Sequence, residues 1–166
     1  MSNQANAVLA VAKKYVTQGY KEGANNDNIF GVWYGANHES WCAMFVSYCF
    51  AQANVLPLVA GIQSAKGFAY CPYAVNHFTS THQLVPVTSA QPGDIVFFNW
   101  SGKGGIAEHV GLVVSNNIGS KLLTTYEGNT ATPGAVAGNE SNGDGCYQKV
   151  RQYEFVVAVA RPKWAN

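Results

Sequence analysis

The chain has little charge, and neither sign dominates. Only 11% of its 166 residues are charged, and the formal net charge is +1 at pH 7. A nucleic-acid-binding domain concentrates Lys and Arg to neutralise phosphates, and no such basic stripe occurs in this sequence. We therefore expect no nucleic-acid partner.

Export signals and long apolar runs are also missing. The first residues lack the basic and apolar regions of a secretory signal, and no later run reaches the ~20 apolar residues that a membrane helix requires. We expect a protein that is made in the cytoplasm without a signal peptide and does not insert into a membrane. It would then reach a target outside the cell by release from the cell or by extracellular delivery.

Cysteine usage gives no sign of a metal centre. The sequence contains Cys42, Cys49, Cys71 and Cys146, with no Cys-x-x-Cys pair and no neighbouring His or Cys to complete a zinc site. We expect no structural metal and no cofactor. The missing export signal favours reduced thiols, and the apolar neighbours of Cys49 indicate core packing.

What the chain does contain is enough apolar material for one core. Its hydrophobic content is 48%, and its length suits one domain better than two. We expect a single domain over residues 1–166, without a separate binding domain, and a monomer.

Helical spacing dominates the first half of the chain and strand patterns dominate the second. Expected helices cover residues 4–18, 40–51 and 74–79, and Ser40 is a natural N-cap for the second of them. Expected strands cover residues 94–98, 109–114, 121–127, 147–151 and 155–160, with a Gly-, Asn- and Ser-rich loop at 128–145. Helices followed by antiparallel strands predict an α+β fold.

Cys42 lies close to the start of the second expected helix. A thiol attacks an amide only as thiolate, and the unpaired N–H groups and dipole of a helix N-terminus lower a thiol pKa. The same N–H groups can stabilise the oxyanion of acyl transfer. Cys42 is therefore a candidate nucleophile.

A base and an orienting group follow on the expected strands. His109 begins the strand 109–114, on the face shared with Gly111 and Val113. Glu127 and Asn129 end the next strand two residues apart, so either can accept the second imidazole N–H if extended geometry continues. Each of these residues alone more often has a structural role. Together, however, they follow the chain order of the papain-type catalytic arrangement: a Cys on a helix, a His on a strand, and a Glu or Asn on the next strand.

Four blocks of the sequence carry a family resemblance. Residues 41–46, 92–98, 109–113 and 127–130 resemble the CHAP family of the NlpC/P60 papain-like group. Residues 28–35 look like the lead-in found in phage endolysins, whereas about 55–85 stays unmatched. The resemblance implies a papain-like fold in which N-terminal helices pack on an antiparallel sheet or half-barrel.

The resemblance also implies a role for each matched residue. It implies Cys42 as nucleophile, His109 as base and then acid, Glu127 as the group that orients His109, and Asn129 as a further polar member. Some CHAP domains bind calcium just before the nucleophile, but residues 35–40 lack the carboxylate cluster that calcium requires. We therefore expect no metal there.

Aromatic side chains are candidates to line a groove for the substrate, because their faces pack well against extended ligands. The candidates are Trp33, Tyr34, Trp41, Trp100 and Trp164. Packing in the core is the alternative for each of them.

The implied activity is that of a peptidoglycan hydrolase of the endolysin type. It would cut amide bonds of the stem peptide or cross-bridge, as an N-acetylmuramoyl-L-alanine amidase or an endopeptidase, through an acyl-enzyme. Alternatives are a secreted antibacterial effector with the same chemistry, a protein deamidase or acyltransferase, and a module that only binds wall peptides.

Overall fold

The computed structural model describes residues 2–102, 104–133 and 142–165, so residues 134–141 of the expected loop lie outside the described part. The helices are α1 (Asn3–Thr17), α2 (Ile29–Tyr34), α3 (Cys42–Gln52) and α4 (Cys71–Ser80). The strands are β1 (Leu84–Val85), β2 (Ile95–Phe98), β3 (His109–Asn117), β4 (Leu122–Thr130), β5 (Gly145–Gln152) and β6 (Val156–Ala160). The α+β prediction is confirmed.

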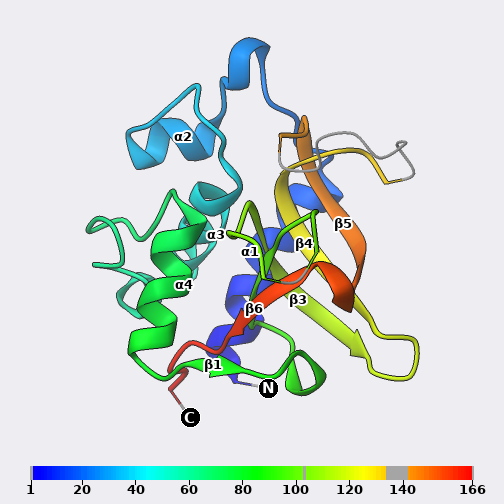
Figure 1. Cartoon of the computed structure of the whole chain (residues 1–166). Helices are drawn as coiled ribbons and strands as arrows, with labels where there is room; N and C mark the ends of the chain where they lie inside the picture. Colours follow the sequence, from blue (N-terminus) through cyan, green and yellow to red (C-terminus); the bar gives the residue numbers. More distant parts are fainter. Residues whose placement is uncertain (1, 103, 134–141, 166) are drawn as a thin grey trace.

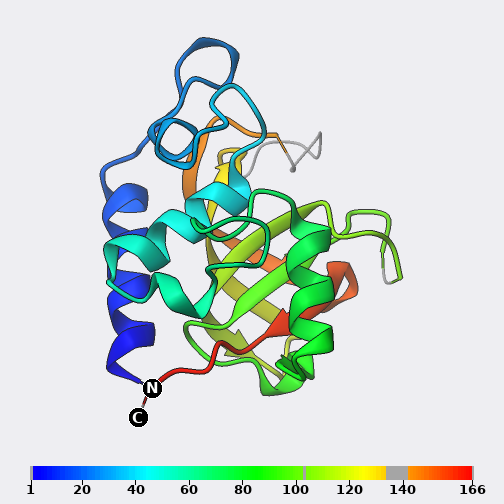
Figure 2. The ribbon, with the colours of Figure 1, turned by 90° about the vertical axis from the view of Figure 1, so that its left-hand side faces the viewer.

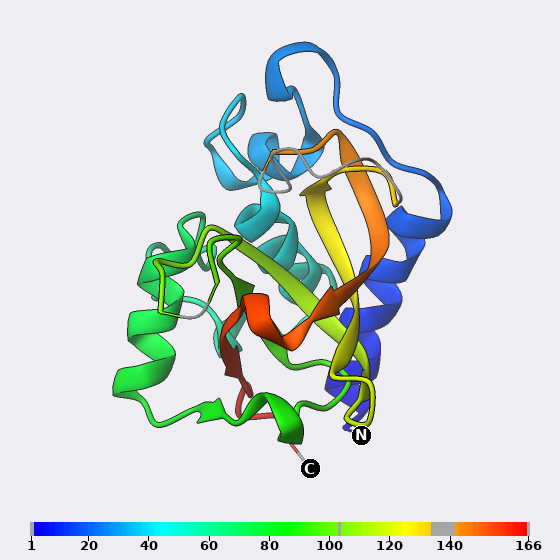
Figure 3. The same ribbon diagram turned by 45° about the vertical axis from the view of Figure 1, so that its right-hand side comes forward.

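The strands form one antiparallel sheet in the order β1-β6-β2-β3-β4-β5. Figure 1 shows α2 and α4 on one side of the molecule and β4 and β5 on the other. The sheet is strongly curved, as the view in Figure 3 makes clear. Because β3 and β4 run in opposite directions, the start of β3 and the end of β4 lie at the same end of the sheet.

Helix α3 occupies the centre of the domain. It packs on β3 and β4 and also contacts α1 and α2, and α1 runs beside it in Figure 2. Its sequence is apolar almost all round, so burial on every face is the expected outcome. The helix therefore has a fixed position relative to the end of the sheet where β3 begins.

Two hydrophobic clusters lie on opposite faces of the sheet. The larger contains Val110 and Leu112 together with the helices, and the smaller contains Phe98 and Val113. Strand alternation predicts this division. It confirms that His109 shares its face with Val113, turned away from the larger cluster.

A part-buried ion pair joins the residue before β2 to the residue after β6. Arg161 donates two hydrogen bonds to Asp94, with Nε–Oδ1 at 3.0 Å and Nη2–Oδ2 at 2.8 Å. The N- and C-terminal segments meet nearby, where the amide of Ala165 donates to Gln4. Among the described residues, no helix is both long and apolar enough to cross a membrane.

Candidate active site

Cys42 is the first residue of α3, which begins later than the capping pattern predicts. The N-cap is Trp41 and no side chain caps the helix, whereas Ser40 is exposed. The prediction of Ser40 as N-cap is wrong because Trp41 is anchored in the core. It stacks on Phe30 at 5.1 Å between ring centroids and donates from Nε1 to Glu22. The first-turn N–H groups of α3 are thus left without a side-chain cap beside the thiol.

His109 and Glu127 form a buried pair at the end of the sheet. The Nε2 atom of His109 lies 2.8 Å from Oε2 of Glu127, and both side chains are fully buried. Burial alone would lower the pKa of His109, but the charge of Glu127 and the hydrogen bonds to Cys42 and Glu127 together raise it to about 9. The imidazolium form is therefore stable at neutral pH.

The sulfur of Cys42 lies on the other side of the imidazole. Nδ1 of His109 makes no hydrogen bond of normal geometry within the described ranges, and Cys42 and His109 are close enough to shift the pKa of each other. The pKa of Cys42 lies well below its usual value because the Cys71 thiol donates to its sulfur, the charge of His109 lies close to it and the Ala43 amide donates to it. A thiolate and an imidazolium can therefore coexist in this site.

Glu127 is held by more than the histidine. Thr125 donates to its Oε1 at 2.6 Å, and Arg151 binds both carboxylate oxygens, with Nε–Oε1 at 2.9 Å and Nη2–Oε2 at 2.5 Å. Burial would raise the pKa of Glu127, but these donors and His109 hold it far below its usual value. Glu127 is therefore ionised at neutral pH.

Two aromatic rings of the smaller cluster cover the histidine. The ring of Phe98 lies 6.2 Å from that of His109 and the ring of Trp100 lies 5.8 Å from it. Phe98 is also the antiparallel partner of His109 across β2 and β3. The imidazole is thus fixed by a ring contact, by strand pairing and by the bond to Glu127.

Cys71, the first residue of α4, is an unexpected member of the site. Both Cys42 and Cys71 are buried, and the thiol of Cys71 donates to the sulfur of Cys42. This bond and burial keep the pKa of Cys71 well above its usual value, so Cys71 stays protonated. The segment before α4 is clamped on α3 because Ser47 Oγ bonds both the carbonyl and the amide of Phe68, at 2.8 and 3.0 Å.

Replacement of Cys71 by Ala should raise the pKa of the Cys42 thiol, because the thiolate loses a donor. We expect Cys42 to react with iodoacetamide about 3- to 10-fold more slowly at pH 6, the loss expected for one weak hydrogen bond. Labelling is followed by mass spectrometry of the Cys42 peptide. Cys146→Ala is the control, since Cys146 is buried beside Cys49 and Tyr15 instead. An unchanged profile for Cys71→Ala would show that Cys71 does not assist the nucleophile.

Gly111 provides the space for the Glu127 side chain. A Cβ atom at residue 111 would lie 2.7 Å from Cγ of Glu127 and 3.2 Å from the carbonyl oxygen of Tyr126. The side chain of Glu127 fills the space that the missing side chain of Gly111 leaves beside His109. Only a residue without a side chain fits here.

Gly111→Ala should displace Glu127 and lower the rate of the catalysed reaction about 10- to 100-fold, since small misplacements of orienting groups have effects of this order. Circular dichroism and the melting temperature report whether the fold persists. The matched control is Gly119→Ala on the β3–β4 turn, where the nearest atom to an added Cβ lies 3.7 Å away. Equal rates for the two variants would contradict this role of Gly111.

Asn129 is buried near Glu127 but not in continued extended geometry. The pairing of β4 with β5 shifts register between Glu127 and Thr130, and Asn129 has a left-handed φ of 52°. Its carbonyl accepts from the amide of Gly143 at 3.0 Å. Of the two candidates for the imidazole partner, Glu127 is the one that binds His109, and a catalytic role for Asn129 stays a prediction.

The aromatic candidates for a groove have different positions. Trp41 is fully buried, so the expectation that it lines a groove is wrong. Trp33 and Tyr34 are half-buried on α2: Trp33 packs on Tyr48, and Tyr34 accepts a hydrogen bond from Ser64. Trp100 is half-buried beside His109, and of these four it is the one in ring contact with the site.

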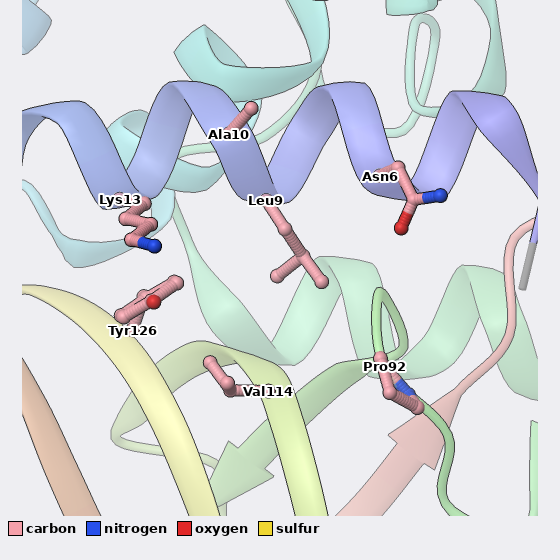
Figure 4. Close-up of a pocket in the computed structure, with 7 residues that line it drawn as sticks. All are labelled: Asn6, Leu9, Ala10, Lys13, Pro92, Val114 and Tyr126. Atoms are coloured by element: carbon pink, nitrogen blue, oxygen red, sulfur yellow. The ribbon is translucent and has the colours of Figure 1, made fainter.

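Trp164 has a structural position, because it stacks on Phe50 of α3 with 5.5 Å between ring centroids. A pocket of about 310 Å³ lies between α1 and the strands β3 and β4 (Figure 4). Its lining residues are Asn6, Leu9, Ala10, Lys13, Pro92, Val114 and Tyr126. None of the site residues borders this pocket, so it is separate from the Cys42 site.

Two site residues were not recognised from sequence. Arg151 ends an expected strand, and a charged residue in alternation with apolar ones is a weak signal for a buried ion pair. Cys71 lies in the segment, about 55–85, in which the sequence showed no block of the family resemblance. Only the packing of α4 on the start of α3 reveals that its thiol meets Cys42.

The comparison with protein families identifies the same region of the chain. The model of the CHAP domain matches residues 33–129, which is more than half of the chain and contains Cys42, His109 and Glu127. The chain belongs to the CHAP family. Its α+β architecture is that of a papain-like CHAP fold, as the resemblance predicts.

This CHAP domain is also similar to a curated protein from Listeria seeligeri, "Probable endopeptidase p60". The two are 34% identical over 110 residues, which cover 66% of this chain and 16% of the Listeria protein. The chain thus spans only a small part of the length of that relative. No solved structure matches the chain at a significant level.

Proposed function

We propose that this CHAP domain is a cysteine peptidoglycan hydrolase that cuts amide bonds of the stem peptide or cross-bridge. The observation that supports it best is the buried array in which His109 lies between the thiol of Cys42 and the carboxylate of Glu127. Membership of the CHAP family and the similarity to an endopeptidase support the choice of substrate.

The chemistry begins from the thiolate–imidazolium pair, in which His109 already holds the proton of Cys42. The thiolate attacks the scissile carbonyl carbon, and N–H groups at the start of α3 stabilise the oxyanion. The imidazolium then protonates the leaving amine as the C–N bond breaks. His109 next takes a proton from water, hydroxide attacks the thioester, and Cys42 is regenerated with release of the carboxylic acid. Glu127 holds the imidazole in one orientation throughout.

Digestion of purified peptidoglycan of several wall types, followed by mass spectrometry of the soluble fragments, tests the proposal. We expect fragments whose masses identify either the bond between glycan and stem peptide or a bond within the peptides. A variant with Cys42→Ala provides the blank. Intact wall material from every type would contradict the proposal and direct attention to protein substrates, the deamidase or acyltransferase alternative.

The biological setting we propose is lysis of the endolysin type, with access to the wall through a holin or delivery from outside. A single domain over residues 1–166 and a monomer stay predictions. The genes beside the coding sequence test the setting: a holin gene supports lysis. An immunity gene would instead support a secreted antibacterial effector.

A further inference from the structure

We infer that Arg151 is a positioning residue of the active site, which acts on His109 through Glu127. The inference rests on the proposed function for its catalytic meaning. It extends the Cys42, His109 and Glu127 array by a fourth residue from the neighbouring strand β5. The carboxylate of Glu127 has charged partners on two sides, His109 from β3 and Arg151 from β5.

The contact between Arg151 and Glu127 fixes the plane of the carboxylate. A guanidinium that binds both oxygens allows one orientation, because two parallel N–H···O bonds must form together. The Oε2 atom that receives Nη2 of Arg151 is the same atom that faces Nε2 of His109. The orientation of the imidazole therefore follows from the position of Arg151.

The charge of Arg151 has a second consequence. A fully buried carboxylate with a histidine as its only charged partner would either take up a proton or bind that histidine permanently as imidazolium. Either state disables a base that must accept and return a proton in each cycle. Because Arg151 keeps Glu127 ionised, His109 can change its protonation state without leaving an uncompensated buried charge.

Arg151 is itself held rigidly. Its Nη2 atom also lies 3.1 Å from Oγ1 of Thr130, and its guanidinium carbon lies 4.6 Å from the ring centre of Trp100. The same Trp100 ring contacts His109 at 5.8 Å. Trp100 thus contacts both the arginine and the histidine, at the two ends of the array Arg151, Glu127 and His109.

The test measures the reactivity of Cys42 without any wall substrate. Iodoacetamide labelling is followed at pH 6 to 8 by mass spectrometry of the Cys42 peptide in wild type, Arg151→Met, Glu127→Gln and the double variant. We expect each single variant to label about 10- to 100-fold more slowly, since His109 is no longer held where its imidazolium stabilises the Cys42 thiolate. The double variant should label within about twofold of Glu127→Gln, because Arg151 has no effect once the carboxylate is gone.

The melting temperature separates this role from a merely structural one. Each single variant removes one member of the buried Arg151–Glu127 pair and should melt on the order of 10 °C lower, whereas the double variant removes both charges and should regain most of that loss. The double variant should therefore recover its melting temperature but not the reactivity of Cys42. Arg161→Met breaks a similar two-point ion pair, with Asp94, away from His109, and should lose stability while Cys42 keeps its wild-type reactivity.

Two results would overturn the inference. One is a labelling rate in the double variant that falls below that of Glu127→Gln by the same factor as Arg151→Met falls below wild type. The other is wild-type reactivity of Arg151→Met. If Arg151→Met does not fold, Arg151→Lys retains the charge without the two-point contact and should label at an intermediate rate. Wild-type reactivity of Arg151→Lys would then overturn it. Labelling of Cys42 needs no peptidoglycan, so a wrong substrate proposal gives a different result. The variants would then label as predicted here, while the wild type would not digest cell-wall material.

Discussion

Replacement of Cys42 by Ala should abolish the release of fragments from peptidoglycan, with a rate at least about 10⁴-fold below wild type, because no other group can form the acyl-enzyme. The thiol is small and lies at the first residue of a helix, so its removal should leave the fold intact. Fragment release is measured by mass spectrometry, and folding by circular dichroism.

The matched control is Cys49→Ala in the same helix. Cys49 is fully buried and its pKa is well above the usual value because of burial, so it is not a reactive thiol. Its loss should cost about 1–2 kcal/mol of stability through packing and leave the rate per folded molecule unchanged. Continued hydrolysis by Cys42→Ala, or inactivity of folded Cys49→Ala, would refute the assignment.

Replacement of His109 by Ala should lower the hydrolysis rate about 10³-fold, the typical contribution of a positioned general base. The thiolate of Cys42 also loses its imidazolium partner, so labelling of Cys42 at neutral pH should slow in parallel. The control His82→Asn changes an exposed histidine with a positive φ of 55°, which Asn tolerates. Slow hydrolysis with unchanged labelling would contradict the pairing of His109 with Cys42.

The pH dependence of the wild type follows from the same pair. The pKa of His109 is raised to about 9, so the imidazolium is present at neutral pH and is lost as the pH rises through this value. The pKa of Cys42 is lowered, so the thiolate is present above that lowered value and is lost on acidification. Hydrolysis should therefore follow a bell whose alkaline limb lies near pH 9, and this limb should be absent in His109→Ala.

The sequence was sufficient for the parts of the site that follow local rules. The strand that begins at His109 and the alternation through Val113 could be predicted from a period of two. The capping residue could not, because the burial of Trp41 overrides the preference for Ser40 at a helix start. Burial of one large side chain thus shifted α3 and made Cys42 its first residue.

The rest of the site depends on contacts between distant segments. Arg151 meets Glu127 only through the register of β4 and β5, in which it pairs with Leu123. Cys71 meets Cys42 only because Ser47 holds the segment before α4 against α3. No local pattern encodes either contact, and the family resemblance contains no counterpart for them.

The central claim is that Cys42 is the nucleophile. The most direct test measures how the hydrolytic activity falls as the labelled fraction of Cys42 rises. The native enzyme is treated with substoichiometric iodoacetamide at pH 7, and the label on each cysteine peptide and the residual peptidoglycan hydrolysis are measured in the same samples. We predict that label appears on Cys42 ahead of the other three cysteines and that activity falls in a one-to-one relation with it. Full labelling of Cys42 with hydrolysis retained would contradict the account.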